Sequence, residues 1–189
     1  MDFTSDVDHC LKVLQEGGVI LYPTDTVWGL GCDATNADAV QKIFTIKQRS
    51  ESKALIVLLA DERELIKYVA HPDLGIFDYL EQTQKPTTVI YNGAIGLAPN
   101  LIAEDGSVAI RLVQDDFCRH LIKRFRKPIV STSANVSGQN APPFFAAIAP
   151  EIIDAADYTV QFRRDDETVH QPSAIIQWVG NGAIKVLRE

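Results

Sequence analysis

Apolar positions along the chain follow two periods in turn, one typical of helices and one typical of strands, from one end to the other. Val7, Cys10 and Leu14 recur at helical spacing, and the segment 54–60 is apolar almost throughout, as in a strand buried on both faces. The pattern predicts an α/β domain, with helices at 6–16, 36–46, 61–69, 115–125 and 143–154, and strands at 19–22, 54–60, 86–91, 107–112 and 128–132.

The last part of the chain predicts a β-hairpin. Apolar segments at 173–179 and 183–187 flank Gly180-Asn181-Gly182, a triplet that favours a tight turn. A hairpin pairs antiparallel strands, so we expect a mixed sheet. A length of 189 residues suits one domain or at most two small ones, and we interpret 1–189 as a single domain.

Composition narrows the class of protein. Hydrophobic residues make up 46% of the chain, and 18 Lys and Arg against 25 Asp and Glu give a net charge of −7. Broad nucleic-acid surfaces usually carry a basic excess, so any anion site here is expected to be local. No apolar stretch approaches the roughly 20 residues of a membrane span, and we see no signal peptide. Three dispersed cysteines, at 10, 32 and 118, indicate reduced, buried thiols and a cytoplasmic protein.

Lys47 and Arg49 are the first candidates for chemistry. If the helix before them ends near Ile46, both side chains can point into one cleft. The guanidinium fork suits phosphate oxygens and the ammonium acts as a point charge, so the pair could clamp a triphosphate. The alternative is two solvated cations that close a helix, which its dipole favours.

Ser131, Ser133 and Asn135 share one face if the strand continues past Val130. Two hydroxyls and an amide at the carboxyl end of a strand suit a phosphate, a sugar or a small polar substrate. The alternative is a loop of small polar residues that satisfies its own backbone.

Thr24 and Thr26 leave the strand 19–22 on one side, with Asp25 opposite, as either ligand contacts or an ordinary turn. Arg111 ends another strand, where it either binds an anion or extends to solvent as an edge residue. No catalytic triad or paired catalytic carboxylates stand out, which favours positioning and electrostatics over covalent catalysis.

The remaining charged residues give weaker signals. The four histidines lack metal-ligand spacing, so we expect them at the surface and predict no protein metal site. The basic cluster 119–127 is either a solvated helix face or a weak RNA-binding patch. The segment 163–167 holds two arginines and three acids, and we expect a self-compensating loop.

Four motifs in order resemble the YrdC/Sua5 family over nearly the whole chain: Pro-Thr-Asp-Thr-Val-Trp-Gly-Leu at 23–30, Lys-x-Arg at 47–49, Ser-x-Asn at 133–135 and Pro-Ser at 172–173. The resemblance implies a twisted mixed α/β sheet around a deep positive cleft. It also implies L-threonylcarbamoyladenylate synthase activity, which makes threonylcarbamoyl-AMP and pyrophosphate from L-threonine, bicarbonate and ATP, with Mg²⁺. A separate tRNA threonylcarbamoyltransferase complex then modifies adenosine 37 of tRNA.

The family's residue roles carry over by position. The resemblance implies catalytic roles for Lys47 and Arg49. It implies ATP contacts for both of these and for Lys53, Ser133, Asn135 and Arg188. It implies substrate contacts, including L-threonine, for Thr24, Thr88, Ser131 and Ser173, and we predict that Arg111 is a further substrate contact.

Some positions depart from the family pattern. Leu58 stands where some members have a substrate-contacting His, and Ala174 replaces a frequent Thr. Two alternatives therefore remain beside the synthase. One is a paralogue with the same nucleotide cleft and a different acceptor. The other is an RNA-binding module that contacts tRNA or double-stranded RNA, against which the net charge of −7 counts.

Overall fold

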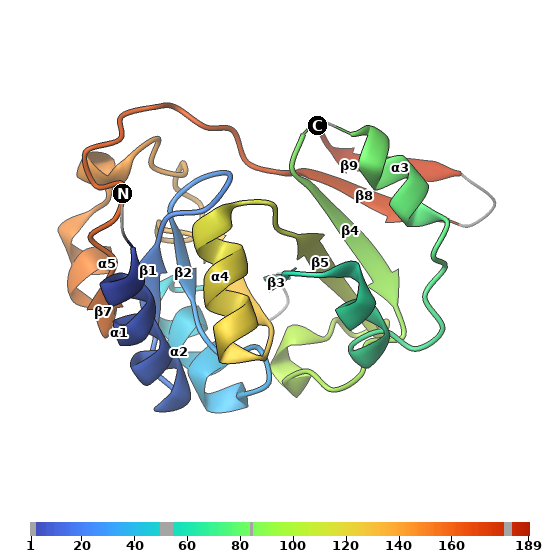
Figure 1. Ribbon diagram of the computed structural model, residues 1–189, viewed down its shortest axis with the longest axis horizontal. Coiled ribbons are helices and arrows are strands. Elements are labelled where there is room, and N and C mark those ends of the chain that lie inside the picture. Colours follow the sequence, from blue (N-terminus) through green and yellow to red (C-terminus); the bar gives the residue numbers. More distant parts are fainter. Residues whose placement is uncertain (1–2, 50–54, 84, 180–182) are drawn as a thin grey trace.

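The computed structural model describes residues 3–49, 55–83, 85–179 and 183–189 (Figure 1). Within them, nine strands form a mixed sheet in the order β7-β1-β2-β6-β3-β5-β4-β8-β9. The pairs β1–β7, β3–β5 and β4–β8 are parallel and the others antiparallel. The strands are β1 Ile20–Tyr22, β2 Gly29–Gly31, β3 Ile56–Leu59, β4 Thr87–Asn92, β5 Ser107–Leu112, β6 Ile129–Ser133, β7 Tyr158–Thr159, β8 Ala174–Trp178 and β9 Ile184–Arg188.

Helices flank this twisted sheet, which confirms the predicted α/β class. Helix α4 packs beside α1, as Figure 1 shows. The segment after β7 crosses the top of the molecule in that view to reach β8. The helices are α1 Thr4–Gln15, α2 Ala37–Ile46, α3 Ile76–Gln82, α4 Asp116–Phe125 and α5 Pro150–Asp154, with 3₁₀ turns η1 Glu62–Lys67, η2 Pro99–Leu101 and η3 Phe145–Ala147.

Side-chain caps set the starts of two helices that bear on the site. The Asn36 carboxamide accepts from the N–H groups of Asp38 and Ala39 at 3.0 and 3.1 Å, which confirms the predicted cap of α2. Asp115 accepts from the Cys118 N–H at 2.9 Å and begins α4. Both helices bury the apolar face that the sequence predicts.

Two predicted helices are wrong in part. The segment 143–154 contains only the short turn η3 and α5, because Pro150 excludes the helical conformation at the residue before it, where Ala149 has ψ 135°. The segment 61–69 forms the 3₁₀ turn η1 rather than an α-helix, although Asp61 caps it as expected.

Four elements escaped the sequence pattern: α3, β2, β7 and the 3₁₀ turn η2. Strand β2 is Gly-Leu-Gly, which carries little strand propensity, and its pairing with β1 and β6 creates it. At the other end, β8 and β9 pair antiparallel as predicted. The turn 180–182 lies outside the described residues.

The register of the sheet brings distant residues into rows. Arg111 lies between Leu58 on β3 and Thr88 on β4. One row away on the same face lie Ser131, Ile56, Ala109 and Ile90, because residues two apart on a strand point the same way.

The remaining predictions about residue environments agree with the structure. Cys10, Cys32 and Cys118 are free and buried, and the four histidines are exposed. Among the residues described, no helix has both the length and the apolar character needed to cross a bilayer.

Candidate functional site

A cavity of about 410 Å³ opens over the central strands of the sheet. This volume falls within the range of small-ligand sites. Its floor is the row of Ile56, Ala109 and Ile90, and its walls come from segments far apart in the sequence. Six predicted site residues line it: Arg49, Arg111, Ser131, Ser133, Ser173 and Arg188.

Arg49 reaches the cavity because the chain reverses directly after α2. Lys47 ends the helix, and Gln48 adopts a left-handed conformation with φ 49°. The Arg49 N–H then donates to the Phe44 carbonyl at 2.9 Å, a hydrogen bond typical of helix termini. Burial lowers the pKa of the Arg49 guanidinium, which nevertheless stays charged.

Lys47 does not line the cavity. Its side chain is 1% exposed, and Nζ donates to the backbone carbonyls of Ser133 at 2.5 Å and Asn135 at 2.7 Å. Burial, with a smaller effect of the nearby Arg49 cation, lowers the pKa of Lys47 to about 8. The expectation that both Lys47 and Arg49 point into the cleft is therefore wrong for Lys47.

The lowered pKa of Lys47 predicts a pH-dependent stability. Between about pH 8 and 10.5 the unfolded chain holds a proton on this amine that the folded protein has lost, so the unfolding free energy rises with pH. From pH 7.5 to 9.5, the Lys47 contribution should increase stability by about 2 kcal/mol relative to Lys47→Met. Urea titrations of both proteins at the two pH values measure this, and a constant difference would contradict it.

Ser131 and Ser133 both line the cavity from the end of β6. Gly29 pairs with Ser133 across the sheet, and a Cβ at Gly29 would lie 3.2 Å from the Ser131 Oγ. The missing side chain therefore leaves room beside the two hydroxyls. Asn135 differs, since its Nδ2 donates to the carbonyls of Val136 and Gln139 at 2.9 Å and braces the loop.

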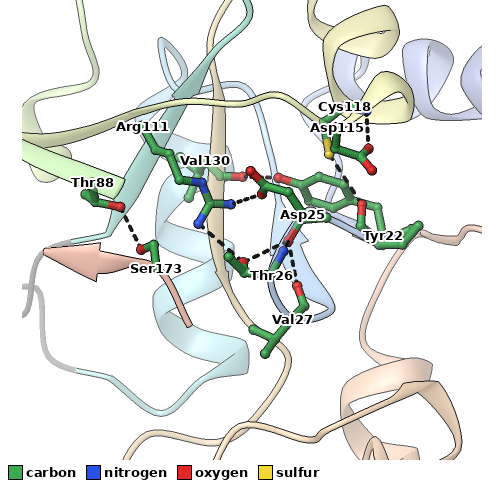
Figure 2. A network of polar contacts seen from close by, with 12 residues as sticks. Tyr22, Asp25, Thr26, Val27, Thr88, Arg111, Asp115, Cys118, Val130 and Ser173 are labelled. Atoms are coloured by element: carbon green, nitrogen blue, oxygen red, sulfur yellow. Dashed lines mark hydrogen bonds and ion pairs between the residues drawn. The ribbon is translucent and has the colours of Figure 1, made fainter. Parts of the chain in front are cut away.

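Arg111 is the most buried cation of the cavity wall, at 3% exposed. Figure 2 shows its side chain beside Asp25 and Thr26. Its Nη2 lies 2.9 Å from a carboxylate oxygen of Asp25, and Nη1 donates to the Thr26 hydroxyl at 3.3 Å. The solvent-extended alternative for Arg111 is therefore wrong. Nε and Nη2 have no well-aligned hydrogen-bond acceptor among the described residues, although Nη2 is ion-paired with Asp25. Arg111 also lines the cavity, where it is a fixed cation.

Asp25 is a site residue that the sequence interpretation did not single out. Burial raises the pKa of its carboxyl, and the Arg111 cation partly offsets that effect. The signal available was its position between Thr24 and Thr26, opposite both hydroxyls.

Ser173 and its neighbours close the other end of the cavity. The Ser173 hydroxyl lies 2.8 Å from that of Thr88, which is fully buried. Figure 2 shows the two side chains facing each other. Arg188 on β9 donates from Nε and Nη2 to the Ser173 carbonyl at 3.0 and 2.8 Å. Burial and the Arg111 cation lower the pKa of Arg188, so two cations face the same space.

Thr24 organises its own turn instead of lining the cavity. Its hydroxyl donates to the Val27 carbonyl at 2.8 Å and accepts from the Thr26 N–H at 3.0 Å. Arg163 donates to the Thr24 carbonyl at 3.4 Å and forms an ion pair with Asp115. The expected loop at 163–167 is confirmed, but the expectation that its charges compensate one another is wrong for Arg163, which pairs with Asp115 outside the segment.

The electrostatic character of the cavity follows from its lining. Arg49, Arg111 and Arg188 contribute three guanidinium groups, and the described lining includes no carboxylate. Asp25 forms an ion pair with Arg111 but does not itself line this cavity. Three guanidiniums with serine hydroxyls between them suit a polyanion such as a nucleotide. Lys53, another predicted ATP contact, lies outside the described residues.

Comparison with known proteins gives the family. The Sua5/YciO/YrdC family model, described as telomere recombination, matches residues 12–189. A relative from Pseudoalteromonas translucida, named threonylcarbamoyl-AMP synthase, is 33% identical over 178 residues, 93% of this chain and 94% of its own length.

Solved structures agree on the fold. Sua5 of P. abyssi, crystallised with L-threonine, superposes with a TM-score of 0.84 at 21% identity over 97% of this chain. This chain spans about half of that protein, 54% of its length. E. coli YciO superposes with a TM-score of 0.75 at 20% identity, over 98% of this chain and 89% of its own. The chain therefore belongs to the Sua5/YciO/YrdC family.

Proposed function

We propose that this chain is a threonylcarbamoyl-AMP synthase, an ATP-dependent enzyme that makes an adenylate for tRNA modification. Relatives about one-third identical over most of the chain carry that name. The observation that carries the proposal is the cavity itself, in which three guanidiniums and three serine hydroxyls surround one space of about 410 Å³. Such a lining suits a substrate with several phosphates and a carboxylate.

The reaction balances without a protein nucleophile. The amine of L-threonine and bicarbonate give a carbamate, with loss of water. A carbamate oxygen forms a bond to the α-phosphorus of ATP, the bond from that phosphorus to the β-phosphate oxygen breaks, and pyrophosphate leaves. Negative charge develops on the phosphate oxygens, so fixed cations accelerate the step by electrostatic stabilisation. Arg49 and Arg188 provide these cations for ATP.

Threonine occupies the part of the cavity nearest Arg111. The Arg111 guanidinium in the cavity wall attracts the carboxylate of the amino acid, and the hydroxyls of Ser131 and Ser173 bind its polar groups. Thr24 and Thr88 support this site indirectly, since Thr24 shapes the turn that holds Thr26 and Thr88 orients Ser173. Ser133 and the loop braced by Asn135 contact the nucleotide.

Mg²⁺ would accompany ATP without a protein cage. The described cavity lining has hydroxyls and guanidiniums but no carboxylate, and no group of three His, Cys, Asp or Glu side chains in the described chain could hold a metal. Magnesium keeps several waters and binds readily through substrate phosphates. Phosphate oxygens and water would therefore supply its ligands, and the ion would neutralise phosphate charge.

The product passes to a separate tRNA threonylcarbamoyltransferase complex, and a cytoplasmic location agrees with the three buried free thiols.

Direct RNA binding has less support. In the basic cluster, Arg124 pairs with Asp8 and Lys127 pairs with Asp33. Arg119 and Lys123 on α4 and Arg126 at its C-cap remain exposed. A patch with this little excess charge gives weak, salt-sensitive contact with tRNA at most.

Pyrophosphate release with ATP, bicarbonate and one amino acid at a time tests the function. Threonine should give at least about 10-fold more release than serine, because a methyl group in an apolar pocket is worth about that factor. Ile56 and Ile90 provide apolar surface in the cavity. Equal release with threonine, serine and no amino acid would refute the synthase and favour the paralogue with another acceptor.

A further inference from the structure

The loop 133–139, which carries Ser133 to the cavity, is tied to the end of α2 through Lys47. Lys47 Nζ donates to the carbonyls of Ser133 and Asn135. In return the Ser137 N–H donates to the Lys47 carbonyl at 2.8 Å. One residue therefore makes three hydrogen bonds with the loop, from both its side chain and its backbone.

The position of this contact matters for the cavity. Lys47 lies two residues before Arg49, and the left-handed Gln48 fixes the turn between them. Ser133 enters the cavity wall from β6, a strand 86 residues away from Lys47 along the chain. Lys47 is 1% exposed and does not line the cavity. It therefore bears on the lining residues Arg49 and Ser133 through its contacts with the loop.

We propose that Lys47 is a positioning residue, which holds Arg49 and Ser133 at a fixed separation across the cavity by binding the loop 133–139. It acts through these two residues and not through its own contact with phosphate. The proposal rests on the proposed function for its kinetic consequences, but the loop contact itself is independent of the reaction.

Lys47→Met is the first variant, because methionine fills a similar volume and donates no hydrogen bond. Its control is Lys42→Met on the same helix, where Nζ donates at 2.9 Å to the Gly17 carbonyl, outside the cavity lining. Lys47→Met should lower kcat/KM for ATP by about 10- to 100-fold. Lys42→Met should stay within about 2-fold of wild type.

A double-mutant cycle with Ser133→Ala separates positioning from direct phosphate binding. If Lys47 acts through Ser133, then Ser133→Ala should cost much less in the Lys47→Met background than in wild type. Hydrogen exchange at the Ser137 amide should also accelerate in Lys47→Met and stay unchanged in Lys42→Met. Additive kinetic losses with an unchanged Ser137 amide would overturn the proposal.

A second variant keeps the lysine intact in case Lys47→Met does not fold. The Gln139 N–H donates to the Val136 carbonyl at 3.2 Å, and Gly138 has φ 91°, so Ser137 holds the second position of a turn that accepts proline. Ser137→Pro removes the N–H that binds Lys47, and Ser137→Ala removes only the hydroxyl.

Ser137→Pro should be about 3- to 10-fold slower than Ser137→Ala. Equal rates would overturn the proposal. If wild type shows no threonine-dependent reaction, the proposed function fails. ATP binding by calorimetry and hydrogen exchange in the Lys47→Met and Lys42→Met pair then still decide whether Lys47 positions the loop.

Discussion

Replacing Arg49 with alanine should lower kcat for pyrophosphate release by about 100- to 1,000-fold, the usual cost of removing one fixed donor to developing charge. Arg49 lines the cavity from the reversed chain after α2, and burial there strengthens its interaction with phosphate oxygens. Initial rates at saturating ATP, bicarbonate and threonine measure the effect. The thermal midpoint should change little, because this side chain forms part of the cavity wall and not of the apolar core.

Two further variants provide the comparison for Arg49→Ala. Arg49→Lys keeps the charge but loses the bidentate fork, so its rate should fall between wild type and Arg49→Ala. Arg63→Ala removes an arginine with an 88% exposed side chain on η1, and its rate should stay within about 2-fold of wild type. A wild-type rate for Arg49→Ala would remove Arg49 from the active site.

Replacing Arg111 with methionine should have the largest effect on stability, a loss of about 3–5 kcal/mol in the free energy of unfolding. The change leaves the Asp25 carboxylate without its cation in a site where burial already raises its pKa. Urea unfolding at pH 7.5 measures the loss. The affinity for threonine should fall as well, because the variant has lost its carboxylate ligand.

The double variant Asp25→Asn with Arg111→Met separates the two consequences. Asparagine removes the stranded charge, so the double variant should recover part of the stability that Arg111→Met alone loses. Threonine binding should not recover, since the guanidinium is still missing. If binding returned together with stability, Arg111 would serve the fold and not the substrate.

The structure supports the central premise of the site. Arg49 and Ser133, from segments with no sequence proximity, line the same cavity, together with Arg111, Ser173 and Arg188. The period-two alternation along β5 and β6 makes Arg111, Ser131 and Ser133 recognisable as candidates from the sequence alone. Alternation leaves open whether Arg111 binds an anion or extends to solvent. Its pairing with Asp25, from the turn after β1, decides against solvent.

The hydrogen-bond partners of Lys47 could not be predicted from the sequence. Its residue type and its spacing from Arg49 suggest a second phosphate ligand, but the carbonyls that bind its ammonium belong to a loop 86 and 88 residues away. Which acceptors a lysine meets depends on the packing of β6 against the end of α2. Thr24 and Thr88 are similar, since the Thr24 hydroxyl is satisfied by a local turn and the Thr88 hydroxyl by Ser173, which directly precedes β8.

The sequence by itself determined the α/β class, most of the helices and strands and the capping of α2, because these depend on apolar periodicity and on local hydrogen bonds. Only the tertiary structure decided the strand order, the formation of β2 and the partners of the buried cations. The reason is physical: strand pairing and the burial of charge are long-range interactions, whose energies depend on neighbours that come close only when the chain is folded.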